Sequence, residues 1–196
     1  MFRELHEAEF QPFFQLRAEP EVGRHFDPAN RGHGRWLSDR ITRNFARGVR
    51  FFAAYEDDAS PRGLVSLYVD DLIAWKLGFI THLGVFSEFR GSGYGSKLLA
   101  YAAEQAQLEG CYCLYLDTYA GNPRNVEFYA KNGFIPVATI PDMNGPGDEG
   151  QVWFRKILAD KPQHTAQCTE CRSIADMEGA IPGLSLDNIR EEEDRS

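Results

Sequence analysis

The chain has 196 residues, 43% of them hydrophobic, with 14 phenylalanines and a formal net charge of −8. This length and apolar content suit one enzyme-sized domain with a sizeable core, and the negative charge argues against a nucleic-acid binder. The chain has no run of about 18 apolar residues and no signal-peptide pattern, so we expect a soluble, cytoplasmic protein with no membrane contact, in which the four cysteines are free thiols.

The first 50 residues predict one strand and two helices. Residues 2–5 are typical of a short strand, and residues 7–18 are typical of a helix that ends before Pro20. A second, amphipathic helix is expected over residues 34–47 because four large apolar residues recur on one helical face: Trp36, Leu37, Ile41 and Phe45.

The middle and end of the chain predict strands, with two helices among them. The expected strands cover residues 50–56, 63–70, 79–86, 111–118, 134–139 and 151–158, and the expected helices cover residues 96–109 and 125–132. A turn is expected over residues 60–63. This order indicates a mixed α/β (α+β) fold whose sheet is mostly antiparallel, with one βαβ unit.

A glycine-rich loop stands where the strand over residues 79–86 gives way to a helix. It reads Arg90-Gly91-Ser92-Gly93-Tyr94-Gly95-Ser96. Three glycines in five residues allow a sharp turn and a close approach to a ligand, and the free N–H groups of the next helix favour an anion. We interpret the loop as a pyrophosphate cradle, since its spacing fits neither a Walker P-loop nor a dinucleotide fingerprint.

A second motif follows between residues 122 and 134: Asn122-Pro123-Arg124-Asn125-Val126-Glu127-Phe128-Tyr129-Ala130-Lys131-Asn132-Gly133-Phe134. Together with the run from Val85 to Gly95, it resembles the GNAT superfamily of acetyl-CoA-dependent N-acetyltransferases. The resemblance covers about residues 1–158 and implies a twisted sheet of about six or seven strands with about four helices. The central strands of this fold splay to form an acyl-CoA cleft, and we expect a domain over residues 1–159 followed by an acidic extension, 160–196.

The resemblance also implies which residues hold acetyl-CoA. The loop would present backbone amides to the pyrophosphate, with charge added by Arg90 and Lys97, and the N–H of Val85 would bond the thioester carbonyl in an oxyanion-type contact. Strand edges at Leu83 to Val85 and at Asp117 to Tyr119 would line the pantetheine arm, and Asn122 would help to bind it. The expected cofactor-binding residues are Leu83, Val85, Arg90, Gly91, Ser92, Gly93, Tyr94, Gly95, Ser96, Asn122 and Tyr129.

Tyr129 is the residue that we expect to act as the general acid. A phenol beside the sulfur can protonate the departing thiolate, whereas the alternative is a core aromatic residue on an amphipathic helix, as Phe128 is expected to be. Asn125 departs from the small Ala that is usual in this family.

The general base is less well defined. Many family members carry a Glu that would align near Phe79, so this chain lacks it. His82 is the nearest titratable group on that strand and is well suited to accept a proton, although strand alternation places it on the opposite face from Val85. Asp70, Asp71 and Asp117 are alternatives, and His82 is equally consistent with a structural, hydrogen-bonded histidine.

Residues 160–196 hold nine Asp or Glu against four Lys or Arg. His164, Cys168 and Cys171 have the spacing of three zinc ligands, but zinc usually takes four, so we expect free thiols and no metal. The apolar stretch 180–190 is interpreted as a mobile extension, or as a segment that docks on a partner or on a second subunit of a homodimer.

The predicted function is transfer of an acetyl group from acetyl-CoA to a primary amine of a small molecule or peptide. The alternative is a catalytically silent acyl-CoA sensor or interaction module on the same fold. Residues 24–50 hold seven Arg against two Asp, which is either a solvated helix face or an attraction for an acidic acceptor or for the phosphates of coenzyme A. His25, Phe26, Trp36 and Trp75 are candidates to wall the acceptor and are equally plausible as core residues.

Overall fold

The computed structural model describes residues 1–14, 16, 33–57, 60–70, 76–143 and 146–159. Within them the chain forms eight strands: β1 (Phe2–Leu5), β2 (Arg50–Tyr55), β3 (Pro61–Asp70), β4 (Leu77–Ile80), β5 (Leu83–Val85), β6 (Cys113–Tyr119), β7 (Ile135–Ile140) and β8 (Gln151–Ile157). The α-helices are α3 (His33–Ala46), α4 (Tyr94–Leu108) and α5 (Pro123–Lys131), and three short 3₁₀ turns are η1 (Glu7–Glu9), η2 (Gln11–Phe14) and η3 (Ser87–Phe89).

The strands form one mixed sheet in the order β1-β2-β3-β4-β6-β8-β7, with β5 paired to β3. All pairs are antiparallel except β4 with β6, which α4 connects as a βαβ unit. The predicted α/β fold with a mostly antiparallel sheet is therefore confirmed. The sheet has eight strands because the predicted strand over residues 79–86 is broken into β4 and β5.

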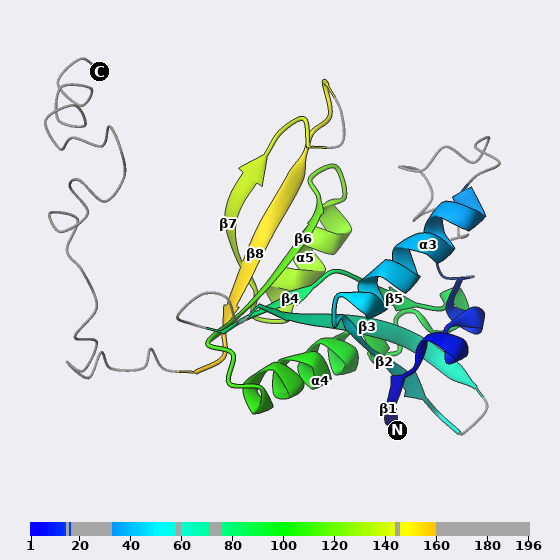
Figure 1. Cartoon of the computed structure of the whole chain (residues 1–196). Coiled ribbons are helices and arrows are strands. Elements are labelled where there is room, and N and C mark those ends of the chain that lie inside the picture. The colour runs from blue at the N-terminus through cyan, green and yellow to red at the C-terminus, as the bar shows by residue number, and fades with distance from the viewer. Residues whose placement is uncertain (15, 17–32, 58–59, 71–75, 144–145, 160–196) are drawn as a thin grey trace, which may run out of the picture. The chain divides into compact units, whose positions relative to one another are not determined.

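The core lies in two clusters on the two faces of the sheet. Figure 1 shows α4 and α3 on opposite sides of the strands. On β2, Phe52 and Ala54 pack with α4 and α5, whereas Phe51 and Ala53 pack with the N-terminal turns and α3. This alternation explains the unbroken apolar run in β2, because a strand covered on both faces has no polar side to present.

The predicted helix over residues 7–18 is wrong in the described part, which forms η1 and η2 instead. Pro12 would stand in the interior of such a helix, where it has no N–H to donate and its ring clashes with the preceding turn. Phe10 and Phe13 are buried all the same, because consecutive 3₁₀ turns also bring residues three apart onto one side.

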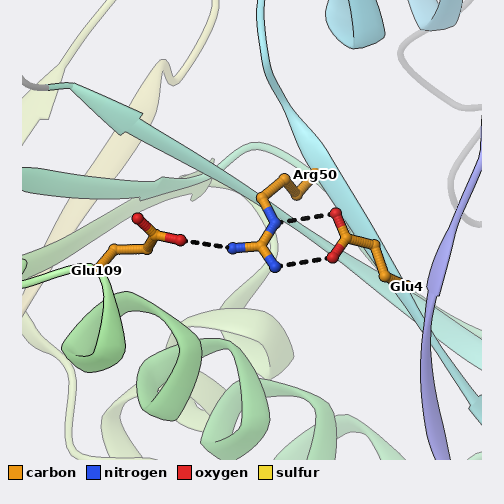
Figure 2. Close-up of polar contacts among 3 residues, drawn as sticks. All are labelled: Glu4, Arg50 and Glu109. Carbon is orange, nitrogen blue, oxygen red and sulfur yellow. Dashed lines mark hydrogen bonds and ion pairs between the residues drawn. The ribbon is translucent and has the colours of Figure 1, made fainter.

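An arginine at the start of β2 ties together elements that are distant in the sequence (Figure 2). Arg50 donates from Nε and Nη2 to the two carboxylate oxygens of Glu4, at 2.9 and 2.7 Å, and from Nη1 to Glu109 at 2.9 Å. Glu4 belongs to β1, and Glu109 caps the C-terminal end of α4. The guanidinium therefore lies at a helix C-terminus, where a cation is favoured by the helix dipole.

The far edge of the sheet is formed by β7, all six residues of which are exposed. Its pairing with β8 is irregular between Pro136 and Ala138, with Val137 as the extra residue. Ile135 and Val137 are 58% and 47% exposed, so this strand contributes little to the core.

Candidate functional site

Two central strands of the sheet separate at one point. β4 pairs with β6 from Leu77–Cys113 to Ile80–Leu116, after which β5 pairs only with β3 and no longer with β6. Beyond Leu116, β6 continues to Tyr119 along β8 and faces no strand on its other edge within the described residues. This is the splay that the family resemblance implied.

The main-chain groups of β5 that face this opening can be assigned from its pairing. The Phe86 N–H donates to the Arg62 carbonyl at 3.1 Å, and the Ser66 N–H donates to the His82 carbonyl at 2.9 Å, so even-numbered residues of this stretch face β3. Alternate residues of a strand direct their N–H and C=O groups to opposite edges. Leu83 and Val85 therefore direct theirs toward the splay.

The glycine loop is held beside this edge. Arg90 Nε donates to the Val85 carbonyl at 3.2 Å, which fixes the start of the loop to β5. Gly91 and Gly93 have φ of +77° and +82°, a region that residues with a Cβ rarely adopt. The Lys97 N–H donates to the Gly93 carbonyl at 3.1 Å, so the amides of residues 94–96 are the unpaired first turn of α4.

Gly95 is the point at which three elements meet. A Cβ on Gly95 would lie 3.0 Å from Phe128 Cζ on α5 and 3.8 Å from Val85 Cγ2 on β5. The absence of a side chain therefore lets the start of α4 lie directly against α5. In this way the loop, the open edge of β5 and the helix that carries Tyr129 are brought together.

Tyr129 is a buried aromatic residue, 9% exposed, with its ring 5.8 Å from that of Phe154 and 6.2 Å from that of Phe134. Its hydroxyl has no hydrogen-bond partner among the described residues. Burial raises the pKa of Tyr129, and the nearby carboxylate of Asp117 raises it further. The phenol therefore stays protonated at neutral pH, as a proton donor must.

Asn122 and Asn125 organise the start of α5. The Asn122 side chain caps the helix by accepting from the Asn125 N–H at 3.2 Å, and Pro123 occupies the first helical position. Asn125 Nδ2 donates to Thr118 Oγ1 on β6 at 3.3 Å. This bond ties α5 to β6 and gives a structural reason for an Asn where the family usually has Ala.

The candidate bases are not all brought to the splay. Asp70 pairs with Leu77 at the far end of β4, and Asp71 lies outside the described residues. Asp117 begins the open edge of β6. The surrounding protein keeps water from its carboxylate and so raises the pKa of Asp117 above the ordinary value, an effect that the charge of Arg40 opposes in part. Phe79, where the family's Glu would align, stacks on Tyr115 with ring centroids 5.7 Å apart.

His82 lies at the break between β4 and β5, and its side chain is 7% exposed. Its ring is 5.7 Å from that of Phe51, whereas Val85 packs against the cluster on the other face, as strand alternation predicted. His82 Nδ1 lies 2.8 Å from Thr81 Oγ1, and the His82 N–H donates to Ser66 Oγ at 2.8 Å. The sequence interpretation missed both Ser66 and Thr81, since neither belongs to a motif.

Several other expectations concern residues that the structure does not describe. His25, Phe26 and Trp75, the side chain of Trp36, and His164, Cys168 and Cys171 all fall there. In the described ranges no three or more His, Cys, Asp or Glu residues gather as metal ligands, and no helix is long and apolar enough to cross a membrane. Cys111 and Cys113 are buried free thiols, and burial raises the pKa of both.

The model of the Acetyltransferase (GNAT) family matches residues 2–134. The chain is 35% identical over 80 residues to the acetyltransferase Atu2258 of Agrobacterium fabrum, a match covering 40% of this chain and 54% of that protein. The chain thus spans about half the length of the curated relatives it matches.

Solved structures of similar fold include a GNAT-family protein from Desulfovibrio desulfuricans, with a TM-score of 0.65 and 20% identity over 81% of this chain and 99% of that one. A Bacillus subtilis acetyltransferase in complex with CoA has a TM-score of 0.60 and 17% identity, over 81% of this chain and 98% of that one. At these identities the likeness concerns the fold.

Proposed function

This chain belongs to the GNAT acetyltransferase family, and we propose that it transfers the acetyl group of acetyl-CoA to a primary amine of a small molecule or peptide. The observation that carries the proposal is the open edge of β5 beside the glycine loop. Leu83 and Val85 present main-chain groups to the splay there, and the unpaired amides of the first turn of α4 lie next to them.

These features fit the parts of acetyl-CoA. Backbone amides of Gly91 to Ser96, with the helix dipole behind them, suit the pyrophosphate, and Arg90 and Lys97 add positive charge. The edges of Leu83 to Val85 and of Asp117 to Tyr119 suit the amides of the pantetheine arm. In this proposal Asn122 acts by holding the start of α5, which positions Tyr129.

Acetyl-CoA, when bound, supplies an acetyl group activated as a thioester. We assign the Val85 N–H as the donor to the carbonyl oxygen, on which negative charge grows as the amine attacks. Tyr129 is assigned as the proton donor to the departing sulfur, because its phenol is protonated at neutral pH and its hydroxyl has no partner within the described part of the chain.

A turnover assay tests this function. The protein is incubated with acetyl-CoA and a panel of amines that includes diamines, aminoglycosides and peptides. The concentration of free thiol is monitored over time, and the masses of the products are measured by mass spectrometry. We expect saturable thiol release and a mass gain of one acetyl group on at least one amine, and no release without an amine. Tight binding of acetyl-CoA with no turnover for any amine would instead favour the acyl-CoA sensor.

A further inference from the structure

The break between β4 and β5 is built around one buried hydroxyl. Ser66 on β3 is fully buried, and its Oγ accepts from the N–H of Thr81 at 3.1 Å and from the N–H of His82 at 2.8 Å. The side chain thus takes the place of a strand partner for two successive amides that the break would otherwise leave unsatisfied.

The hydrogen atoms of this cluster can be assigned to particular bonds, so its hydrogen bonds run in one direction, from Ser66 to Thr81 to His82. A hydroxyl has two lone pairs and one hydrogen, and the two amides occupy both lone pairs of Ser66. Its hydrogen then goes to Thr81 Oγ1 at 2.9 Å, because His82 Nδ1 is 3.5 Å away. Thr81 in turn has its own hydrogen to donate, and His82 Nδ1 lies 2.8 Å from its oxygen.

We propose that Thr81 relays the proton of the acceptor amine to His82, an inference that rests on the proposed acetyltransferase function. His82 is buried, whereas Thr81 is exposed at the point where the strands separate. Thr81 Oγ1 keeps one lone pair that no bond among the described residues uses. A protonated amine can donate to that lone pair without touching the imidazole.

The proton transfer conserves atoms and charge. The N–H bond of the ammonium breaks as an O–H bond forms at Thr81 Oγ1, while the original Thr81 O–H bond breaks as an N–H bond forms at His82 Nδ1. The positive charge ends on the imidazole ring, and the lone pair stays on the amine nitrogen, ready to attack the thioester. Ser66 is a positioning residue here, since it orients Thr81 and never carries the proton itself.

The relay requires the His82 tautomer that carries its hydrogen on Nε2. In the other tautomer Nδ1–H would donate to Thr81, so the hydrogen bonds would run from His82 to Thr81 and away from the imidazole. Nδ1 could then accept no proton. Because the chain has only five histidines, two-bond ¹H–¹⁵N correlation spectra can identify the tautomer, with His82→Gln used for assignment. We expect Nε2–H, and an Nδ1–H tautomer would overturn the relay.

Two substitutions test the hydroxyl directly, in the full-length protein with the amine that is turned over best. Thr81→Val keeps the shape but removes the hydroxyl, and we expect kcat to fall about 10²-fold with acetyl-CoA affinity unchanged, while Thr81→Ser restores turnover to within about 3-fold of wild type. Thr139→Val, the same change at an exposed position of β7, serves as the control and should leave kcat unchanged. Wild-type kcat in Thr81→Val would overturn the relay.

The two proposals can fail separately. If the wild-type protein turns over no amine, the acetyltransferase proposal fails, and the relay fails as a catalytic step with it, whichever tautomer the spectra show. If turnover is found and Thr81→Val matches wild type, only the relay fails.

Discussion

At the scale of single residues, Tyr129 combines a packed ring with a hydroxyl that has no partner in the described structure. Tyr129→Phe keeps the ring and removes only the proton donor. We therefore expect kcat to fall by about 10² to 10⁴, with acetyl-CoA affinity largely kept, which steady-state kinetics and calorimetric titration can measure.

Tyr101→Phe is a suitable control for that experiment. Tyr101 is a partly buried tyrosine of α4 whose ring stacks on Phe2 at 4.6 Å, remote from the splay. Loss of its hydroxyl should leave kcat unchanged. If Tyr129→Phe likewise turns over at the wild-type rate, Tyr129 is a packing residue and another group protonates the sulfur.

Gly93 allows a second test at this scale. Its φ is +82°, and a Cβ there would meet nothing within 4 Å, so Gly93→Val acts through backbone conformation rather than through a clash. A left-handed conformation costs a residue with a Cβ about 1–2 kcal/mol, and relief of this strain would shift the loop amides. We expect acetyl-CoA affinity to fall about 10-fold or more by calorimetry.

The matched control is Gly110→Val, at the other end of α4. Gly110 has a φ of +81°, and a Cβ there also meets nothing within 4 Å. Both variants should lose similar stability, but only Gly93→Val should lose affinity for acetyl-CoA. If Gly93→Val binds acetyl-CoA as tightly as Gly110→Val and the wild type do, the assignment of the loop as the pyrophosphate site is wrong.

At the scale of elements, the sequence predicted most helices and strands because their periodicity is local. Residues 34–47 carry apolar side chains at helical spacing and form α3, and the strands β1, β2 and β8 were predicted within one residue at each end. The break after Ile80 was not predicted, because it depends on a contact with Ser66, 15 residues before Thr81 in the sequence. No local pattern reveals such a contact.

The same reasoning applies to the candidate site. The glycine loop and Tyr129 were predicted because each belongs to a motif with fixed spacing. Thr81 and Ser66 are common residues without one, and only the proximity of β3 to the β4–β5 break brings them to His82.

The ion pairs of Arg50 give a pH-dependent prediction about how β1 and α4 are held (Figure 2). The hydrogen bonds from Arg50 lower the pKa of Glu4 below its ordinary value of 4.5. Burial opposes this effect in part, and the positive charge of Arg50 adds to it. A carboxylate with a lowered pKa stabilises the fold above that ordinary value, and this stabilisation is lost as pH falls through the folded-state pKa.

We therefore expect Glu4→Gln to lower the free energy of unfolding at pH 7, by less than about 1 kcal/mol because the pair is partly exposed. The difference from wild type should shrink below about pH 4.5 and vanish at lower pH, as urea unfolding at several pH values can show. Glu127→Gln removes the exposed pair with Lys131 and should change stability still less. A Glu4→Gln effect that grows as pH falls would contradict this account.

At the scale of the whole molecule, the described domain is anchored at its C-terminal end by Leu158. The Leu158 N–H donates to the Tyr112 carbonyl at 3.0 Å, Gln107 donates to the Leu158 carbonyl at 2.6 Å, and the side chain packs against the core of the α4 face. We propose that residues 160–196 are an extension that this domain does not need in order to fold.

A chain that ends at Lys161 should accordingly unfold at the same temperature as the full protein and bind acetyl-CoA equally well. A chain that ends at Lys156 loses Ile157 and Leu158, and we expect it to be about 1–3 kcal/mol less stable. Thermal unfolding with and without acetyl-CoA distinguishes the two. If the Lys161 chain is insoluble or gains no stability from the cofactor, the proposed boundary is wrong; a lower mass by light scattering alone would identify the extension as an assembly segment.

The irregular outer strand β7 limits how copies of this protein can associate through their sheet edges. A proline is tolerated in a strand where its missing N–H faces away from the partner, so the outer edge of β7 lacks a donor at Pro136, and the extra residue Val137 interrupts the ladder next to it. An edge of this kind is a poor template for another strand. The irregular edge therefore disfavours the formation of fibres by strand addition to this exposed, uncharged and apolar segment. The sheet therefore stops growing at β7, and any self-association there would have to rely on side chains such as Ile135 and Ile140 instead of backbone pairing.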